Sequence, residues 1–178
     1  MEGYTLVLTK EHVECCASIP ATLVAEFSQV VSTVARAQRD IYGSFILYEH
    51  GRTGGCLVDS EGEPHCYHAH LHCVPVVVDM ASVLRDQFQS HDFDSWESLI
   101  KWYQTCHVPY LLMGDESKLT CFEVDQPIPR QYLRKLAAGA VGAPSLADWQ
   151  TYQGRDKISV AKEKLGPSIR ECYSTEFA

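Results

Sequence analysis

Strict alternation of polar and apolar residues marks one segment of the chain, residues 64–75. Three histidines, His68, His70 and His72, stand at every second position, and apolar residues separate them. Side chains of a β-strand alternate between the two faces of a sheet, so this spacing predicts a strand with all three histidines on one face. Cys66 falls on the same face by parity.

The rest of the chain contains both helical and strand-like patterns of apolar residues. We expect a helix capped by Ser18, and polar connections at residues 50–55 and 90–94. The strands are close in sequence and suit antiparallel pairing, so the predicted fold class is α+β. Strands are predicted at residues 4–9, 44–49, 66–74, 110–113 and 119–124, and helices at residues 19–39, 80–88, 95–103, 129–142 and 155–164.

Length and composition indicate an ordinary globular protein. The 178 residues, 46% of them hydrophobic and 21% charged, suit one domain with an adequate core. We assign residues 1–142 to this domain and residues 143–178, where the apolar pattern weakens, to a C-terminal extension that packs on it. No apolar run is long enough to span a membrane and no leader opens the chain, so we expect a cytoplasmic protein.

Charge and cysteine spacing bear on the partners. The net charge of −8 argues against a general nucleic-acid binder, which needs a basic face. None of the eight cysteines forms the Cys-x-x-Cys pair of a zinc knuckle, so we expect reduced and mostly buried thiols.

Two chemistries suit the histidine face. A zinc ion could take two of the imidazoles, but His68 and His72 are about 13 Å apart along a strand, so other ligands would be needed. Alternatively, His70 acts as a nucleophile, while the histidines on either side orient it and stabilise charge. A strand whose three imidazoles carry no chemistry is the third alternative. The regular spacing favours the nucleophile.

The same segment resembles a known family. Residues 68–74 are similar to the motif of the histidine triad (HIT) superfamily, in which three histidines alternate with apolar residues. Residues 3–12 resemble the family's strand that ends in a Pro-Lys-x-His turn, with Thr9 in place of the proline. Residues 45–51 resemble the Glu-His-Gly strand end of some bacterial branches. The resemblance covers roughly the first 75 residues.

The resemblance implies a HIT-like fold, a mostly antiparallel sheet of about five strands with packed helices. It also implies a nucleotide hydrolase or nucleotidyltransferase, commonly a homodimer, that needs no metal or other cofactor. His70 would attack the α-phosphate of a nucleotide conjugate, and His72 would hydrogen-bond the phosphate or the leaving group. His68 would orient His70, with His12 behind it.

Further residues near these motifs are expected to bind the substrate. The glycine-rich segment 50–55 could bring backbone amides to an anion, or it could be a plain hairpin turn. The alternative for the whole chain is a non-catalytic nucleotide-binding or zinc-binding protein of the same fold. The residues assigned to substrate binding are Lys10, Glu49, His50, Gly51, Arg52, His65 and Cys66.

Overall fold

The structure is a computed structural model that describes residues 1–53, 68–115, 117–148, 151–152 and 154–176, with side chains up to residue 171. The described residues form one six-stranded sheet in which every neighbouring pair of strands is antiparallel. The predicted α+β class is therefore confirmed. In spatial order the strands are β1 (Thr5–Leu8), β3 (His70–Val74), β2 (Ile46–Gly51), β5 (Tyr110–Gly114), β6 (Leu119–Glu123) and β4 (Ser90–Phe93).

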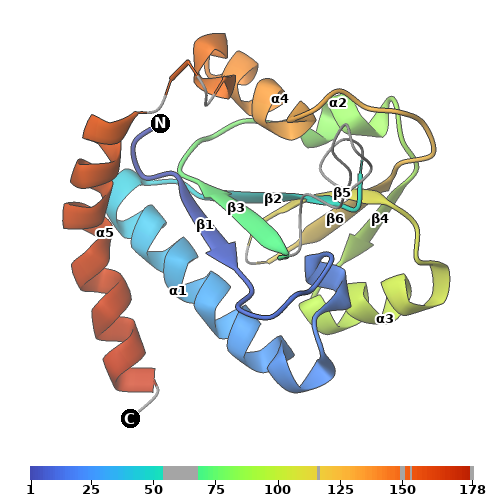
Figure 1. The fold of residues 1–178 in the computed structure, drawn as a ribbon, viewed down its shortest axis with the longest axis horizontal. Helices are drawn as coiled ribbons and strands as arrows, with labels where there is room; N and C mark the ends of the chain where they lie inside the picture. The colour runs from blue at the N-terminus through green and yellow to red at the C-terminus, as the bar shows by residue number, and fades with distance from the viewer. Residues whose placement is uncertain (54–67, 116, 149–150, 153, 177–178) are drawn as a thin grey trace.

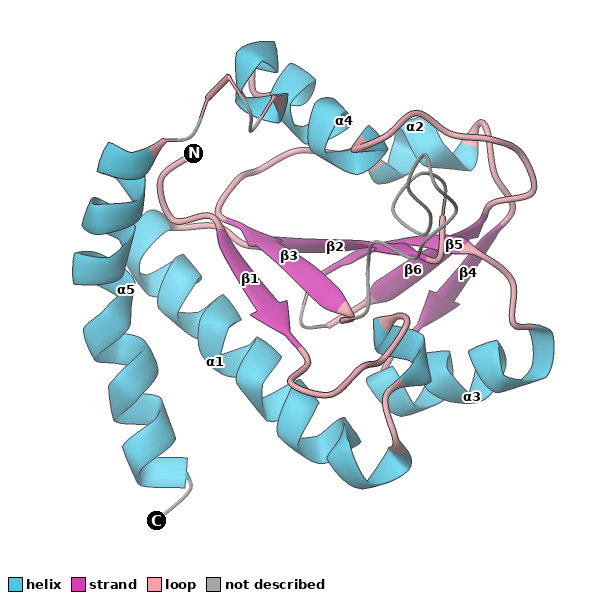
Figure 2. Ribbon diagram, viewed as in Figure 1, coloured by secondary structure: helices cyan, strands magenta, loops and turns pink. Residues whose placement is uncertain are grey.

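Helices cover both faces of the sheet (Figures 1 and 2). One face carries α1 (Val24–Tyr42) and α3 (Trp96–Cys106), and the other carries α2 (Ala81–Arg85) and α4 (Tyr132–Ala140). The outermost helix, α5 (Arg155–Glu176), lies along α1. Among the described helices, none is long and apolar enough to cross a membrane. The short 3-10 helices are η1 (Cys16–Ser18), η2 (Ala21–Leu23) and η4 (Pro144–Ala147).

The strand β3 has neighbours on both edges. His72 lies opposite Leu6 of β1 and Tyr48 of β2. Leu71 and Cys73 point to the other face, where they are completely buried in the core against α1 and α3. The predicted alternation is thus observed over residues 70–74, with imidazoles on one face and apolar side chains on the other.

The first helix begins later than the sequence predicts. Ile19 is extended (φ −60°, ψ 130°), as expected for a residue whose backbone is crowded by the ring of a following proline. The chain then passes through η2, and α1 starts only at Val24. The predicted N-cap at Ser18 is therefore wrong, and its hydroxyl contacts the Cys15 thiol at 3.2 Å instead.

Two segments predicted to be polar connections contribute residues to strands. Residues 90–93 form the edge strand β4, whose Asp92 accepts a hydrogen bond from Thr120 of β6. An edge strand with polar residues lacks the apolar pattern of a buried strand. The sequence therefore did not predict β4. His50 and Gly51 end β2, where they pair with β5.

The C-terminal helix is longer and better packed than predicted. The sequence indicated a solvated helix over 155–164, whereas α5 continues to Glu176. Its residues Ala161, Leu165 and Ile169, spaced by one helical turn, pack against Ala37 of α1 and its neighbours. By contrast, α4 starts at Tyr132, three residues after the expected start.

A buried carboxyl group fixes η1 to the underside of the sheet. Glu49 of β2 accepts hydrogen bonds from the Tyr110 hydroxyl (2.7 Å) and from the Cys16 amide (2.8 Å). The Tyr110 oxygen in turn accepts the Ala17 amide at 3.1 Å. Burial raises the pKa of Glu49. A buried carboxyl group is tolerated only with such partners, so β2, β5 and η1 depend on one another.

The described cysteines are free thiols, as the sequence predicts. Cys15, Cys16, Cys73 and Cys121 are buried, and Cys106 is partly exposed. Burial raises the pKa of the Cys73 thiol to about 12, so it stays protonated and unreactive at neutral pH.

The Glu49 network predicts a measurable stability difference. Tyr110→Phe leaves the Ala17 amide and the Oε2 atom of Glu49 without their buried partner, while Oε1 keeps the Cys16 amide. The loss costs about 1–3 kcal/mol of unfolding free energy. Tyr132→Phe is the matched control, because the Tyr132 hydroxyl donates to Gln87 at the exposed surface. Urea unfolding of the two variants measures the difference. Equal losses of unfolding free energy in the two variants would show that the buried hydrogen bonds of Tyr110 contribute no more to stability than an exposed one.

Candidate functional site

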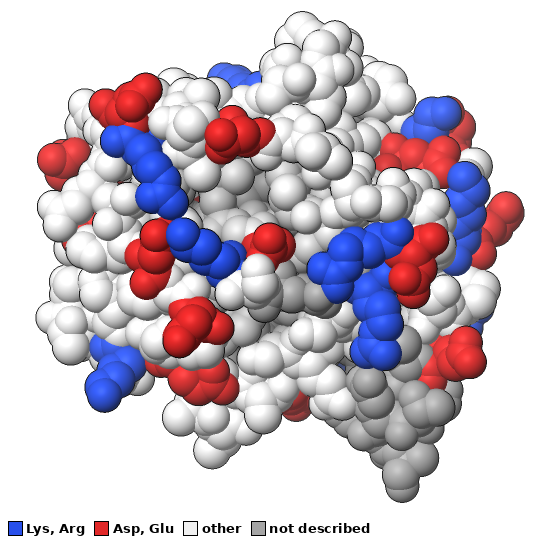
Figure 3. All heavy atoms as spheres, turned by 180° about the vertical axis from the view of Figure 1, so that it is seen from behind, with Lys and Arg blue, Asp and Glu red and all other residues white. Residues whose placement is uncertain are grey.

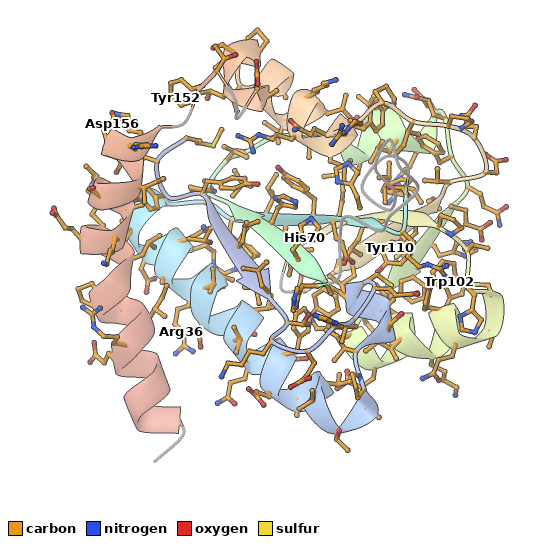
Figure 4. All side chains as sticks on the ribbon, viewed as in Figure 1. Arg36, His70, Trp102, Tyr110, Tyr152 and Asp156 are labelled. Carbon is orange, nitrogen blue, oxygen red and sulfur yellow. The ribbon has the colours of Figure 1, made fainter. Side chains whose placement is uncertain are left out.

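Two histidines of β3 lie side by side on the face of the sheet that carries α2 and α4. The ring centroids of His70 and His72 are 5.2 Å apart, edge to face. His70 is the first residue of β3, and its label lies near the centre of the view in Figure 4. His68 stands two residues before the strand and forms an isolated bridge with Val13. The backbone therefore brings the three predicted histidines together at one end of β3.

The hydrogen bond of His70 defines its tautomer. Its Nδ1 lies 3.1 Å from the carbonyl oxygen of His68. A carbonyl oxygen can only accept, so Nδ1 carries the hydrogen. In the neutral ring, Nε2 then holds an unprotonated lone pair. A free Nε2 is what a nucleophilic imidazole requires.

His68 ties the turn after β1 to the start of β3. Its Nδ1 donates to the carbonyl oxygens of Thr9 (2.9 Å) and Glu11 (3.2 Å). The His12 ring lies edge-on against the His68 ring, with centroids 4.8 Å apart. His12 is thus beside His68, where the sequence analysis placed it. The contact of His68 with His70 is made through its main-chain carbonyl.

His72 is held between two tyrosines. Its ring stacks on that of Tyr48, with centroids 4.6 Å apart and planes 14° apart. Its Nδ1 hydrogen-bonds the Tyr4 hydroxyl. Burial, followed by the charges of His70, His50 and Arg134, lowers the pKa of His72 well below its ordinary value. His72 is therefore neutral at physiological pH.

The Tyr4 hydroxyl interacts with both Nδ1 of His72 and the Tyr48 hydroxyl. The pKa of Tyr4 is raised, mainly by burial, so its hydroxyl stays protonated. When Tyr4 donates to Nδ1 of His72, the hydrogen of the neutral His72 ring is on Nε2, and Nε2 is a donor.

A fourth histidine lies on the same face of the sheet. His50 has the strand parity of Tyr48, and its Nε2 accepts the Leu133 amide of α4 at 3.2 Å. Burial, with a smaller contribution from the charge of His70, lowers the pKa of His50 to about 4. The ring is neutral at physiological pH and links β2 to α4.

Most other residues assigned to substrate binding lie elsewhere. The buried carboxyl group of Glu49 lies on the opposite face of β2 from His50 and is bonded to Tyr110 and Cys16. Gly51 is also buried, and a Cβ there would lie 2.2 Å from the Tyr110 ring, so its role is packing.

The two predicted cationic residues lie on the side of α1 and α3. The Arg52 guanidinium pairs with Glu14 (3.2 Å) and donates to the Tyr103 hydroxyl (3.2 Å). Lys10 lines a groove between β1 and the start of α1. His65 and Cys66 lie outside the described residues. Of the described residues assigned to substrate binding, His50 alone shares the histidine face.

Three residues that lie near the histidines were not among the predicted site residues. Tyr4, Tyr48 and Arg134 surround His72, and the Arg134 guanidinium lies 5.6 Å from the centre of the Tyr4 ring. Strand parity could have indicated Tyr48, which stands two residues before His50. No sequence signal links Arg134 to the triad, because α4 is distant along the chain.

Charge is mixed on the face of the molecule opposite to that of Figure 1. Lys and Arg side chains there lie beside Asp and Glu side chains, and neither sign covers a broad area (Figure 3). Within the described part of the chain, no group of three or more His, Cys, Asp or Glu side chains is arranged to hold a metal ion.

Comparisons with known proteins add no family assignment. Neither a scan against protein-family models nor a search of curated proteins found a match to this chain.

The buried histidines predict a loss of stability in acid. The neutral form of His50 is favoured in the folded state, whereas in the unfolded chain the ring titrates near 6.5. Between these pKa values the unfolded state binds more protons, so stability falls as the pH drops from about 6.5 towards 4. By about pH 5 the loss from His50 is about 2 kcal/mol.

Urea unfolding at a series of pH values measures this slope. His50→Gln should flatten it, while His107→Asn, at an exposed site, should leave it unchanged. An unchanged slope in His50→Gln would contradict the proposed neutral state.

Proposed function

We propose that this protein is a HIT-like nucleotide hydrolase or nucleotidyltransferase that forms a covalent nucleotidyl-histidine intermediate on His70. The observation that carries the proposal is the hydrogen bond from Nδ1 of His70 to the His68 carbonyl oxygen, at 3.1 Å. It leaves Nε2 of His70 unprotonated while the ring is neutral, and it holds the ring in one orientation.

The reaction has two displacement steps at the α-phosphorus. The Nε2 lone pair of His70 forms a bond to phosphorus, and the bond from phosphorus to the leaving group breaks. The leaving group departs with the electron pair and takes a proton from solvent. Water or an acceptor hydroxyl then attacks phosphorus, the phosphorus–nitrogen bond breaks, and His70 is restored as the attacking group releases its proton to solvent.

His72 supports both steps as a neutral donor. Its Nε2 hydrogen, set by the bond between Nδ1 and Tyr4, can reach a phosphate oxygen or the leaving-group atom of a substrate bound at the neighbouring His70. A fixed donor of this kind stabilises charge as it develops and needs no reorganisation.

The arrangement of strands supports the HIT-like interpretation. The motif at residues 3–12 and the triad at residues 68–74 are far apart in the sequence, yet β1 and β3 pair directly. As a result, His12 contacts His68, and His68 anchors the turn at Thr9. If each of these two segments resembled the family motif only by chance, there would be no reason for them to lie together in the fold.

Several properties follow as part of the proposal. The substrate is a nucleotide or nucleotide conjugate, and the chemistry uses neither a metal nor another cofactor, because His70 supplies the nucleophile. The protein acts in the cytoplasm as a homodimer and does not bind nucleic acid in general. A non-catalytic nucleotide- or zinc-binding protein is the alternative outcome of the experiment below.

Trapping the intermediate tests the mechanism. A nucleotide conjugate labelled in its α-phosphate, mixed with the protein and quenched in alkali, should leave the label on His70, because phosphoramidate bonds survive base. His70→Ala should abolish both the label and nearly all turnover, a loss of several kcal/mol, about 10³-fold or more. His91→Ala, a histidine on β4 paired with Glu123, is the control and should react normally.

Label on His68 or His72, or full turnover in His70→Ala, would overturn the nucleophile assignment. A stoichiometric metal ion that is lost in His70→Ala would favour the zinc-binding alternative.

Tyr4 provides a second test, as a positioning residue. Tyr4→Phe removes the hydroxyl bonded to Nδ1 of His72, so the hydrogen of the ring is no longer held on Nε2. We expect kcat to fall about 10–100-fold. We also expect the unfolding free energy to fall by about 1–3 kcal/mol, because Nδ1 of the buried His72 ring loses its partner. Nitrogen-15 shifts of the His72 ring should show a mixture of tautomers. Tyr132→Phe is the control, and an unchanged tautomer in Tyr4→Phe would refute this role.

A further inference from the structure

A cavity of about 410 Å³ opens beyond His72, at the end of β3 opposite to His68. Its walls come from the start of the chain, from β2 and β3, from α4 and η4, and from the first turn of α5. Tyr152, at the approach to α5, marks its outer side (Figure 4). Side chains in its wall include Tyr4, Tyr48, Val74, Arg134, Ala138 and Tyr152.

Two residues of the cavity wall contact the triad. Tyr48, in its wall, stacks on His72, and Tyr4, also in its wall, hydrogen-bonds Nδ1 of the same ring. The His72 ring is in turn 5.2 Å from that of His70. His72 therefore lies between His70 and the tyrosines of the cavity wall.

Arg134 brings positive charge to the cavity wall. Its guanidinium lies over the Tyr4 ring and is positioned by two hydrogen bonds, from Nε (3.3 Å) and Nη2 (3.1 Å), to the Leu146 carbonyl oxygen. Within the described part of the chain, no acidic side chain forms an ion pair with Arg134, and none lines the cavity. A guanidinium has five N–H donors, so the carbonyl leaves several of them for a ligand.

We propose that this cavity is the leaving-group subsite, and that it takes a planar aromatic group carrying an anionic substituent. The proposal rests on the function proposed above, in which His72 faces the leaving group. The aromatic part packs among the tyrosines and the apolar wall, and the anion pairs with Arg134.

The size and chemistry of the walls support this choice. A volume of about 410 Å³ lies within the range of small-molecule sites and accommodates one aromatic ring system. Aromatic side chains stack on planar ligands, and arginine binds carboxylate and phosphate groups through two parallel hydrogen bonds. An uncharged aliphatic group would use neither feature.

A pair of isosteric fragments tests the subsite without turnover. Fluorine NMR can follow 4-fluorobenzoate and 4-fluorobenzamide, which share a shape and differ in charge. We expect the benzoate to bind more tightly by about tenfold, as for a charge-assisted hydrogen bond. Arg134→Met should remove this preference, and Ala138→Leu should weaken both fragments by filling the cavity. Lys135→Met, on the exposed side of α4, is the matched control.

The outcomes separate this proposal from the proposed function. Equal binding of the two fragments, or a benzoate preference that persists in Arg134→Met, would overturn the subsite even if His70 is labelled in the trapping experiment. Failure of the trapping experiment alongside an Arg134-dependent preference would overturn the catalytic proposal and its leaving-group role, and leave an anion-binding cavity. Thermal unfolding of each variant shows whether it remains folded.

Discussion

Pairing of β3 on both of its edges is the constraint on which the site depends. A strand held by β1 on one side and β2 on the other cannot change register, because a shift by one residue would move Leu71 and Cys73 out of the core. The same pairing fixes His70 and His72 on the opposite face. The apolar core thus positions the polar site.

The two faces of the sheet differ in the polar groups that they bury. On the face that carries α1 and α3, the Glu49 network fastens η1 to β2 and β5, and the Glu49 side chain is buried. On the opposite face, burial keeps His50 and His72 neutral, so their nitrogens act as acceptors and donors rather than as fixed cations. Positive charge comes instead from Arg134 on α4. In the proposed site, the nucleophile is the neutral ring of His70, and the positive charge belongs to a different residue, Arg134.

Sequence reasoning succeeded where a signal was local. The period of two at residues 68–72 was enough to place His70 and His72 on one face of the strand, and the motif at residues 3–12 was enough to place His12 beside His68. It failed where proximity in sequence was taken for proximity in space. Glu49 and His50 are adjacent, but they point to opposite faces of β2, and only His50 lies beside the histidines.

The sequence by itself determined the class of the fold, the alternation along β3 and the identity of the central histidine, because each depends on backbone periodicity. The tertiary structure alone decided the hydrogen-bond partner of each imidazole, which is the His68 carbonyl for His70 and the Tyr4 hydroxyl for His72. It also decided that Arg134, about sixty residues after the triad in the chain, lies over the Tyr4 ring, which bonds His72. Packing of α4 over the sheet creates the contact between Arg134 and Tyr4, and no local pattern encodes it.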